Sequence, residues 1–363
     1  GGCLPQARHL LAAERLLLAP SISAEDAAVA IELLADRGVE LAGGTEPLAG
    51  QWPPTFIREL SRGGRSVAML GTDANDELIA VLAHAGNLQL VRPAIKASTF
   101  ETRLNAWAAD YPFRYGLIER EDGNGEFYST MQEFELPLPP AQKVLVVAKP
   151  LLQQLPFNLA QVGGDFAGET VAIGQAPSLT WLADVQERPR TQSTARHAWI
   201  SCSPEAGAYG TLEMVYARLA PLFDEHGFKT DTSGRIPDNV QGAQLTVVTA
   251  HGQLTGENRY FHRIAAEQGL TASPQALARA LADVELVVLF VCSGGRADPH
   301  PLANTAVSLP KMLLDRGCRT VIASPWPLSA AVPGNWLECF IKAWDEGDTA
   351  LDANFKANAY LRT

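Results

Sequence analysis

The chain has 363 residues, of which 47% are hydrophobic and 19% are charged. This is enough apolar sequence for one large core or two moderate domains, and it is typical of a globular rather than a disordered chain. The formal net charge of −11 argues against a general nucleic-acid or anionic-membrane surface, because both require clustered Lys and Arg.

The region before residue 136 contains no recognisable active-site motif. Apolar patterning predicts helices at 5–19, 24–37 and 99–109, a strand at 66–72 and a hairpin across 77–95. Ser23 is the expected N-cap of the second helix, because two acidic residues follow it in the first turn. The Pro-rich stretch ELPLPP predicts a linker at 135–140. We therefore expect a region 1–135, either a docking module or a degenerate half, and a second domain at 136–363.

Beyond this linker, short apolar strands alternate with single helices. The predicted strands lie at 143–149, 170–176, 197–203, 244–252, 284–292 and 318–326, and the helices at 176–186, 211–227, 273–283, 307–317 and 335–347. Such alternation is typical of βαβ units, so the sequence predicts an α/β fold with a largely parallel sheet and helices on both faces. Continuous apolar runs such as VVLFV fit strands that are buried on both sides.

The cysteines and the apolar runs bear on location and cofactors. Five cysteines, an odd number without a CxxC pair, predict neither a disulfide framework nor a zinc ribbon. Reduced thiols are expected in a cytoplasmic protein, and no apolar run reaches the length of a membrane span. The sequence also lacks a phosphate-binding glycine loop, which argues against intrinsic nucleotide dependence. We expect neither a metal nor another cofactor.

Two residues with catalytic chemistry stand at the ends of predicted strands. His251 ends the strand LTVVTA and precedes Gly252, whereas Cys292 ends LVVLFV and precedes Ser293. The spacing of 292 − 251 = 41 residues leaves room for one crossover helix, so the two strands could be neighbours. Because functional groups gather beyond the carboxyl ends of parallel strands, both side chains are expected at the same edge of the sheet.

Each residue also has a structural interpretation. A cysteine that ends a buried strand usually packs as a small apolar side chain, and a histidine before glycine is usually a turn residue. If the two residues are neighbours, the imidazole of His251 can take the proton of the Cys292 thiol and later protonate a leaving amine. Gly252 would bring its backbone N–H close to a substrate carbonyl, where it and the N–H of Cys292 could form an oxyanion hole.

The region from about residue 143 to 360 resembles CHAT domains, the caspase-like family in the clan that also contains caspases and separases. The resemblance runs in order through the blocks VLVVAKPLLQQLPFNLA (144–160), IGQAPSLTWL (173–182), LTVVTAHG (245–252), LVVLFVCSGG (286–295), LPKMLLDRGCRTVIASPWPL (309–328) and ALDANFKANAYLR (350–362). One departure is the extra Gly294, at a place where an acidic or polar residue is commoner.

The resemblance implies a cysteine endopeptidase with His251 as base, Cys292 as nucleophile, and the N–H groups of Gly252 and Cys292 as oxyanion hole. It also implies that the substrate pocket is lined by the loop after the cysteine strand and by the end of the next strand. Those positions are Ser293, Asp298, Ser324 and Trp326. The alternatives are that Asp298 pairs with Arg296 in an ordinary turn, that Trp326 is packing, and that Ser293 begins a tight turn.

Families of this kind act on a specific protein and respond to a trigger, so the resemblance implies a protein substrate and an activating partner in a regulatory or defence system. Neither nucleic acid nor a membrane is expected as a direct partner. A catalytically silent interaction module of the same fold is the alternative, although retention of both His251 and Cys292 disfavours it. A small-molecule thiol hydrolase is disfavoured because no G-x-S-x-G or G-x-C-x-G elbow is present.

Overall fold

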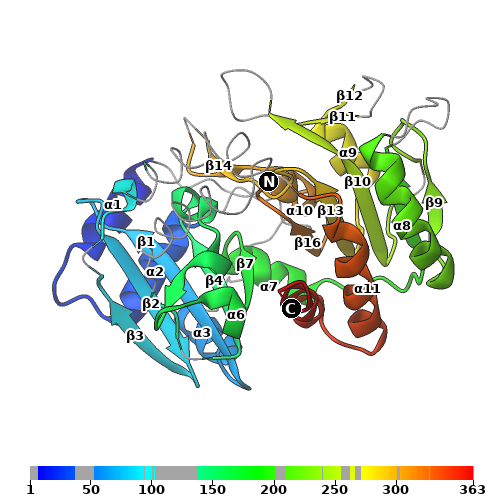
Figure 1. Cartoon of the computed structure of the whole chain (residues 1–363). Helices are drawn as coiled ribbons and strands as arrows, with labels where there is room; N and C mark the ends of the chain where they lie inside the picture. Colours follow the sequence, from blue (N-terminus) through cyan, green and yellow to red (C-terminus); the bar gives the residue numbers. More distant parts are fainter. Residues whose placement is uncertain are drawn as a thin grey trace. The chain divides into compact units, whose positions relative to one another are not determined.

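The structure is a computed structural model, which describes residues 7–36, 53–93, 95–99, 102, 137–139, 141–201, 210–238, 240–254, 262–265, 271–300, 303–326 and 328–362 (Figure 1). The chain forms two compact units. Unit 1 comprises Gly1–Glu187 together with Pro299–Ala306, and unit 2 comprises Arg188–Asp298 together with Val307–Thr363.

Unit 1 contains a mixed five-stranded sheet in the order β3-β2-β1-β4-β7. Its strands are β1 (Arg65–Thr72), β2 (Leu78–His84), β3 (Asn87–Val91), β4 (Lys143–Ala148) and β7 (Ala172–Ala176). The first three form an antiparallel meander, whereas β4 pairs parallel with both β1 and β7. The predicted strands and the predicted hairpin are confirmed here.

Short helices accompany this sheet. They are α1 (Ala7–Leu17), α2 (Ala24–Leu34), α3 (Pro53–Leu60), α6 (Ala167–Thr170), α7 (Leu179–Glu187) and the 3₁₀ turns η1 (Pro150–Gln154) and η2 (Phe157–Leu159), with a ribbon of β5 (Gln161–Val162) and β6 (Asp165–Phe166). The hydroxyl of Ser23 accepts the Asp26 N–H at 3.0 Å, which confirms the expected N-cap of α2. The helix predicted at 99–109 lies almost entirely outside the described residues.

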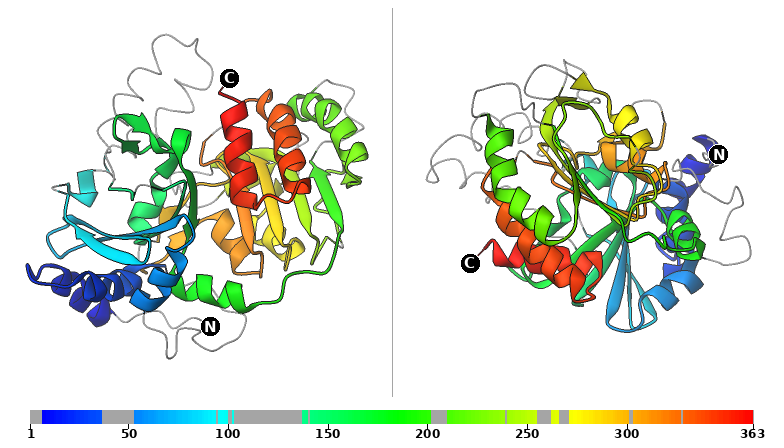
Figure 2. Two further views of the ribbon diagram at one scale, coloured as in Figure 1. Left: turned by 90° about the horizontal axis from the view of Figure 1, so that it is seen from below. Right: turned by 90° about the vertical axis from the view of Figure 1, so that its right-hand side faces the viewer.

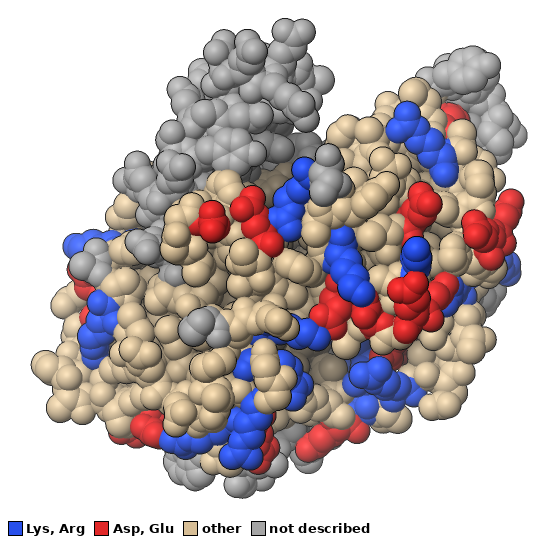
Figure 3. All heavy atoms as spheres, turned by 60° about the horizontal axis from the view of Figure 1, so that its bottom comes forward, with Lys and Arg blue, Asp and Glu red and all other residues tan. Residues whose placement is uncertain are grey.

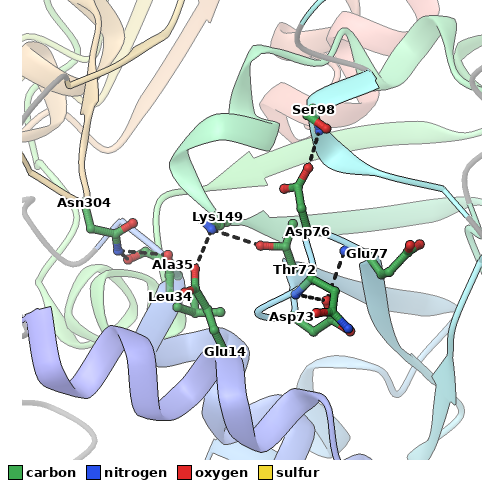
Figure 4. Close-up of polar contacts among 11 residues, drawn as sticks. Glu14, Leu34, Ala35, Thr72, Asp73, Asp76, Glu77, Ser98, Lys149 and Asn304 are labelled. Atoms are coloured by element: carbon green, nitrogen blue, oxygen red, sulfur yellow. Dashed lines mark hydrogen bonds and ion pairs between the residues drawn. The ribbon is translucent and has the colours of Figure 1, made fainter.

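Polar side chains fix α1 and α2 within unit 1. Lys149, which follows β4, donates to Glu14 at 2.8 Å and to the Thr72 hydroxyl at 2.9 Å (Figure 4). The buried carboxylate of Glu32 accepts the N–H groups of Leu179 at 2.9 Å and Thr180 at 3.0 Å. Since a carboxylate is favourable at the N-terminus of a helix, Glu32 links α2 to the start of α7.

Unit 2 contains five parallel strands in the order β9-β8-β10-β13-β16. They are β8 (Arg196–Ile200), β9 (Lys229–Asp231), β10 (Leu245–Leu254), β13 (Leu286–Val291) and β16 (Thr320–Ala323). The far end of β10 also pairs antiparallel with β11 (His262–Ala265), which pairs with β12 (Thr271–Ala272). A short ribbon of β14 (Asp298–Pro299) and β15 (Ala306–Val307) contains residues of both units. The predicted α/β fold with a largely parallel sheet is confirmed.

Helices cover both faces of this parallel sheet. One face carries α8 (Thr211–Glu225), α11 (Val332–Asp345) and α12 (Ala350–Tyr360), which lie side by side in Figure 2. The other face carries α9 (Pro274–Ala280) and α10 (Leu309–Leu314). Every residue of β13 is buried, and its side chains alternate between the two cores. This accounts for the continuous apolar run that predicts the strand.

The sequence-based boundary and the compact units divide the chain differently. β4 and β7 follow the Pro-rich stretch at 135–140, yet their backbones pair in the sheet of unit 1 through β1. Unit 2 begins only at Arg188. The division into domains 1–135 and 136–363 stays a prediction.

Charges of both signs are intermixed on one face of the molecule (Figure 3). On the face shown in Figure 3, Lys and Arg alternate with Asp and Glu and do not gather into a field of one sign. Among the helices that the structure describes, none has both the length and the apolar character required to cross a bilayer.

Asp345 joins three elements of unit 2. Its carboxylate accepts from Arg196 of β8 at 2.5 and 3.2 Å, and it lies 3.0 Å from Nδ1 of His226 at the end of α8. Burial opposes ionisation of Asp345, but the hydrogen bonds and charges of Arg196 and then of His226 outweigh it and hold the pKa of this carboxyl below its usual value.

A lowered pKa in the folded state stabilises the protein above the unfolded pKa of the carboxyl and loses that effect as the pH falls through the folded pKa. We expect Asp345→Asn to lower the unfolding free energy by about 1 kcal/mol at pH 7, since the pair is partly exposed, and by less at pH 3. Urea unfolding at both pH values measures this, with the exposed Asp224→Asn as control. An equal loss at the two pH values would contradict the ion-pair explanation.

Candidate active site

β10 and β13 are neighbouring parallel strands, as the spacing of the two motifs predicts. Their register ends with Ala250 opposite Val291. His251 and Cys292 are therefore the next residues of the two strands, at the same carboxyl edge of the sheet. The crossover between them contains α9, as expected, and also the hairpin of β11 and β12, which the sequence analysis did not identify.

Both side chains belong to the same face of the sheet. Val247 packs in the core under α8 and α11, and strand alternation puts His251 on that side as well. Phe290 packs in the same core, and the sulfur of Cys292 contacts Leu328, which also packs against it. Since both His251 and Cys292 are partly exposed, the edge brings an imidazole and a thiol together within reach of solvent.

Gly252 allows the two strand ends to approach each other closely. A Cβ atom at this position would overlap the carbonyl oxygen of Cys292 and would lie 2.9 Å from both the Cys292 carbonyl carbon and Cγ1 of Val291. The backbones of Gly252 and Cys292 are thus in direct contact, which only glycine permits. The assignment of their N–H groups to an oxyanion hole stays a prediction.

The sulfur of Cys292 is held by the segment that follows β16. The N–H of Leu328 donates to Sγ at 3.4 Å, and the carbonyl oxygen of Leu328 lies 4.0 Å from it. Sequence reasoning did not single out Leu328, because a backbone contact leaves no signature in the residue type.

Cys318 has a different environment and serves as a reference thiol. It is fully buried and donates to the carbonyl oxygen of Leu281 at 3.1 Å. Burial raises the pKa of the Cys318 thiol to about 12, against backbone hydrogen bonds that lower it. Cys339 on α11 is partly exposed. Among the described cysteines, Cys292 alone lies at the carboxyl edge beside a histidine.

A tight turn follows Cys292. Ser293 has a φ of +56°, the N–H of Gly294 donates to the Val291 carbonyl at 2.9 Å, and that of Arg296 donates to the Ser293 carbonyl at 3.1 Å. Positive φ is uncommon for a residue with a side chain, so the neighbouring bonds must hold this turn. The turn interpretation of Ser293 is confirmed, and its role in a substrate pocket stays a prediction.

The turn is bonded to the end of β16. The N–H of Ser293 donates to the Trp326 carbonyl at 3.0 Å, and that of Gly295 donates to the Ser324 carbonyl at 2.8 Å. The hydroxyl of Ser324 accepts the Trp326 N–H at 3.1 Å. Three of the four pocket candidates, Ser293, Ser324 and Trp326, are thereby brought together beside Cys292.

Asp298, the fourth candidate, is buried and forms an ion pair with Arg296. The guanidinium donates through Nε at 3.0 Å and through Nη2 at 2.9 Å to the same carboxylate oxygen, and Nε lies 3.1 Å from the other oxygen. This is the pairing that was the alternative to a pocket role. The carboxylate is thus neutralised by its own chain, and its contact with a substrate stays a prediction.

One carboxylate near His251 in the sequence and two of the five cysteines are not described by the structure. Glu257, Cys3 and Cys202 lie outside the described residues. Within the described ranges, no group of three or more His, Cys, Asp or Glu side chains is placed to hold a metal ion.

Comparison with known proteins agrees with this fold. The model of the CHAT domain matches residues 129–358. Two crystal structures of the Saccharomyces cerevisiae separase–securin complex, at 2.6 and 3.0 Å resolution, resemble the chain with TM-scores of 0.53 and 0.52 at 9% and 10% sequence identity. The similarity covers 80% and 84% of this chain but only 28% and 29% of the matched chains. Among curated proteins there is no significant match.

Proposed function

Since the chain belongs to the CHAT domain family, we propose that it is a cysteine endopeptidase in which His251 is the base and Cys292 the nucleophile. The observation that carries this proposal is the placement of the two residues, which follow the last paired residues of neighbouring parallel strands. A thiol that merely filled the core would need neither the histidine beside it nor the partial exposure that Cys292 has.

The proposed reaction uses these groups in two steps. The imidazole of His251 takes the proton of the Cys292 thiol, and the sulfur attacks the carbonyl carbon of the scissile peptide bond. The N–H groups of Gly252 and Cys292 are proposed to stabilise the oxyanion, an effect of about 10²–10³ in rate per donor in other enzymes. The imidazolium then protonates the leaving amine, and a water molecule hydrolyses the thioester with His251 again as base.

The substrate side chain before the scissile bond is proposed to lie near Ser293, Ser324 and Trp326. Asp298 would receive a basic side chain only after Arg296 had left it, because these two residues form a buried ion pair. Binding therefore exchanges one cation for another, so a basic substrate gains less than it would from a free carboxylate.

A protein substrate and an activating protein partner are proposed for the same site, in a regulatory or defence system of the cytoplasm. The separase–securin complex, which has a similar fold, is a protein bound to a protein partner, and this supports the proposal. A catalytically silent CHAT module remains the competing function, and chemical labelling separates the two.

The test is to identify the cysteine that a peptidyl acyloxymethyl ketone alkylates at pH 7.5. We expect the label on Cys292 and none on Cys318, whose pKa of about 12 and full burial keep it a thiol. Iodoacetamide reports the intrinsic reactivity of each thiol, and Cys339 is the partly exposed reference. The ratio of Cys292 labelling to Cys339 labelling should be higher with the peptidyl reagent than with iodoacetamide. If it is not, the peptidase proposal is wrong and the silent module is favoured.

A further inference from the structure

The chain leaves unit 2 soon after Cys292 and returns to it shortly before α10. Asp298 belongs to unit 2, Pro299–Ala306 belong to unit 1, and Val307 belongs to unit 2 again. The segment that follows the proposed nucleophile is therefore held by residues of unit 1, although it is inserted into the sequence of unit 2.

Asp36 makes the contacts that hold this segment. Its carboxylate accepts the hydroxyl of Thr305 through Oδ1 and the N–H of Ala306 through Oδ2, both at 2.8 Å. Asp36 is only 1% exposed, and its own N–H donates to the carbonyl of Pro177 at 3.0 Å. Bonds to a buried carboxylate are among the stronger hydrogen bonds in proteins, so Thr305 and Ala306 are firmly attached to the end of α2.

Asn304 adds a second attachment at the same place. Its Nδ2 donates to the carbonyl of Leu34 at 3.0 Å and lies 3.4 Å from that of Ala35, at the end of α2 (Figure 4). The last carbonyl groups of a helix have no partner within the helix, so the amide of Asn304 satisfies a bond that α2 requires. Three consecutive residues, 304–306, are thus bound to one helix end.

The connections from this attachment to unit 2 are short. Ser308, whose hydroxyl accepts the Lys311 N–H at 3.0 Å as the N-cap of α10, stands two residues after Ala306. Two residues span at most about 7 Å, so the stretch of chain from Ala306 to Ser308 is short. On the other side, Asp298 is fixed by Arg296, whose N–H donates to Ser293 in the turn after Cys292.

From these contacts we propose that Asp36 is a positioning residue, which sets the turn after Cys292 by holding residues 304–306 at the end of α2. The expected effect on catalysis rests on the peptidase function proposed above, whereas the expected effect on the turn does not. A change at the end of α2 would then alter the turn through the continuous chain that connects them.

The test compares Thr305→Val, which removes the hydroxyl, with Thr305→Ser, which keeps it. For Thr305→Val we expect amide hydrogen exchange in peptides covering 292–298 to rise about tenfold. Alkylation of Cys292 by the peptidyl ketone should slow about tenfold, whereas its alkylation by iodoacetamide should change less than about twofold. Thr305→Ser should behave as the wild type in all three measurements.

Two further variants make the test specific. Asp36→Ala removes both acceptor oxygens, for the Thr305 hydroxyl and for the Ala306 N–H, so the same changes are expected. Lys149→Met removes the bonds to Glu14 and Thr72 elsewhere in unit 1, and exchange at 292–298 should not change. Lys149→Met thus separates positioning from general loss of stability in unit 1.

The outcomes distinguish this proposal from the peptidase proposal. If exchange rises in peptides covering 303–308 but not in those covering 292–298, the positioning role of Asp36 is wrong. If exchange rises at both places but wild-type Cys292 shows no preference for the peptidyl ketone, the positioning role stands and the peptidase function fails.

Discussion

Replacing Cys292 by alanine is expected to lower the rate of peptide cleavage to background, a loss of about 10⁴-fold or more. The sulfur forms the bond to the substrate carbonyl, and none of the other described groups at the carboxyl edge can replace it. His251→Ala should cause a loss of similar size, because a thiol without a base at its side attacks slowly. The double variant should be no slower than Cys292→Ala, since the two residues act as one unit.

The matched control is Cys339→Ala, which removes a partly exposed thiol on α11 and should retain full turnover. Thermal unfolding of each variant shows whether the fold has survived the substitution. Losses that simply add in the double variant would mean that His251 and Cys292 act independently, and would contradict the proposed dyad.

Prediction from sequence succeeded where local pattern and tertiary packing agree. β10 and β13 are recognisable because both faces of the sheet are covered, which favours apolar residues along both strands. Their adjacency follows from a single crossover, and with it the position of His251 beside Cys292. The start of α2 could also be predicted from the sequence, because Ser23 caps it as expected.

Prediction failed for very short strands and for contacts between residues that are far apart in the sequence. The short strands β9 and β11 have three and four residues, too few for a periodic pattern. The N–H of Leu328 reaches the sulfur of Cys292 whatever its side chain is. The bond from Asp36 to Thr305 joins residues 269 positions apart, and no local signal connects them.

Explaining why residue 252 is a glycine requires both the sequence and the structure. The sequence places a glycine after the histidine, where flexibility is the ordinary explanation. The structure gives a different reason, because the position lies against the carbonyl group of Cys292 and φ is not in the left-handed region. The requirement is therefore for space between two strands, and it can be tested without changing either member of the dyad.

Gly252→Ala is expected to reduce the rate of peptide cleavage by about 10²-fold or more, although His251 and Cys292 are both intact. The new methyl group would overlap backbone atoms of Cys292, which cannot move aside as a flexible side chain can. The ends of β10 and β13 must separate, and overpacking of this kind costs about 1–3 kcal/mol of stability. Steady-state cleavage of a peptide, together with urea unfolding, measures both effects.

Gly334→Ala is the matched control, because its new Cβ would meet only the Cβ of Arg218 at an ordinary 3.7 Å. This glycine lies within α11, so alanine should leave turnover unchanged and raise stability by about 0.5–1 kcal/mol. Full turnover in Gly252→Ala would show that the close approach of the two strands is not required for catalysis. The oxyanion hole would then have to be sought elsewhere, since the N–H of residue 252 would have been displaced without effect.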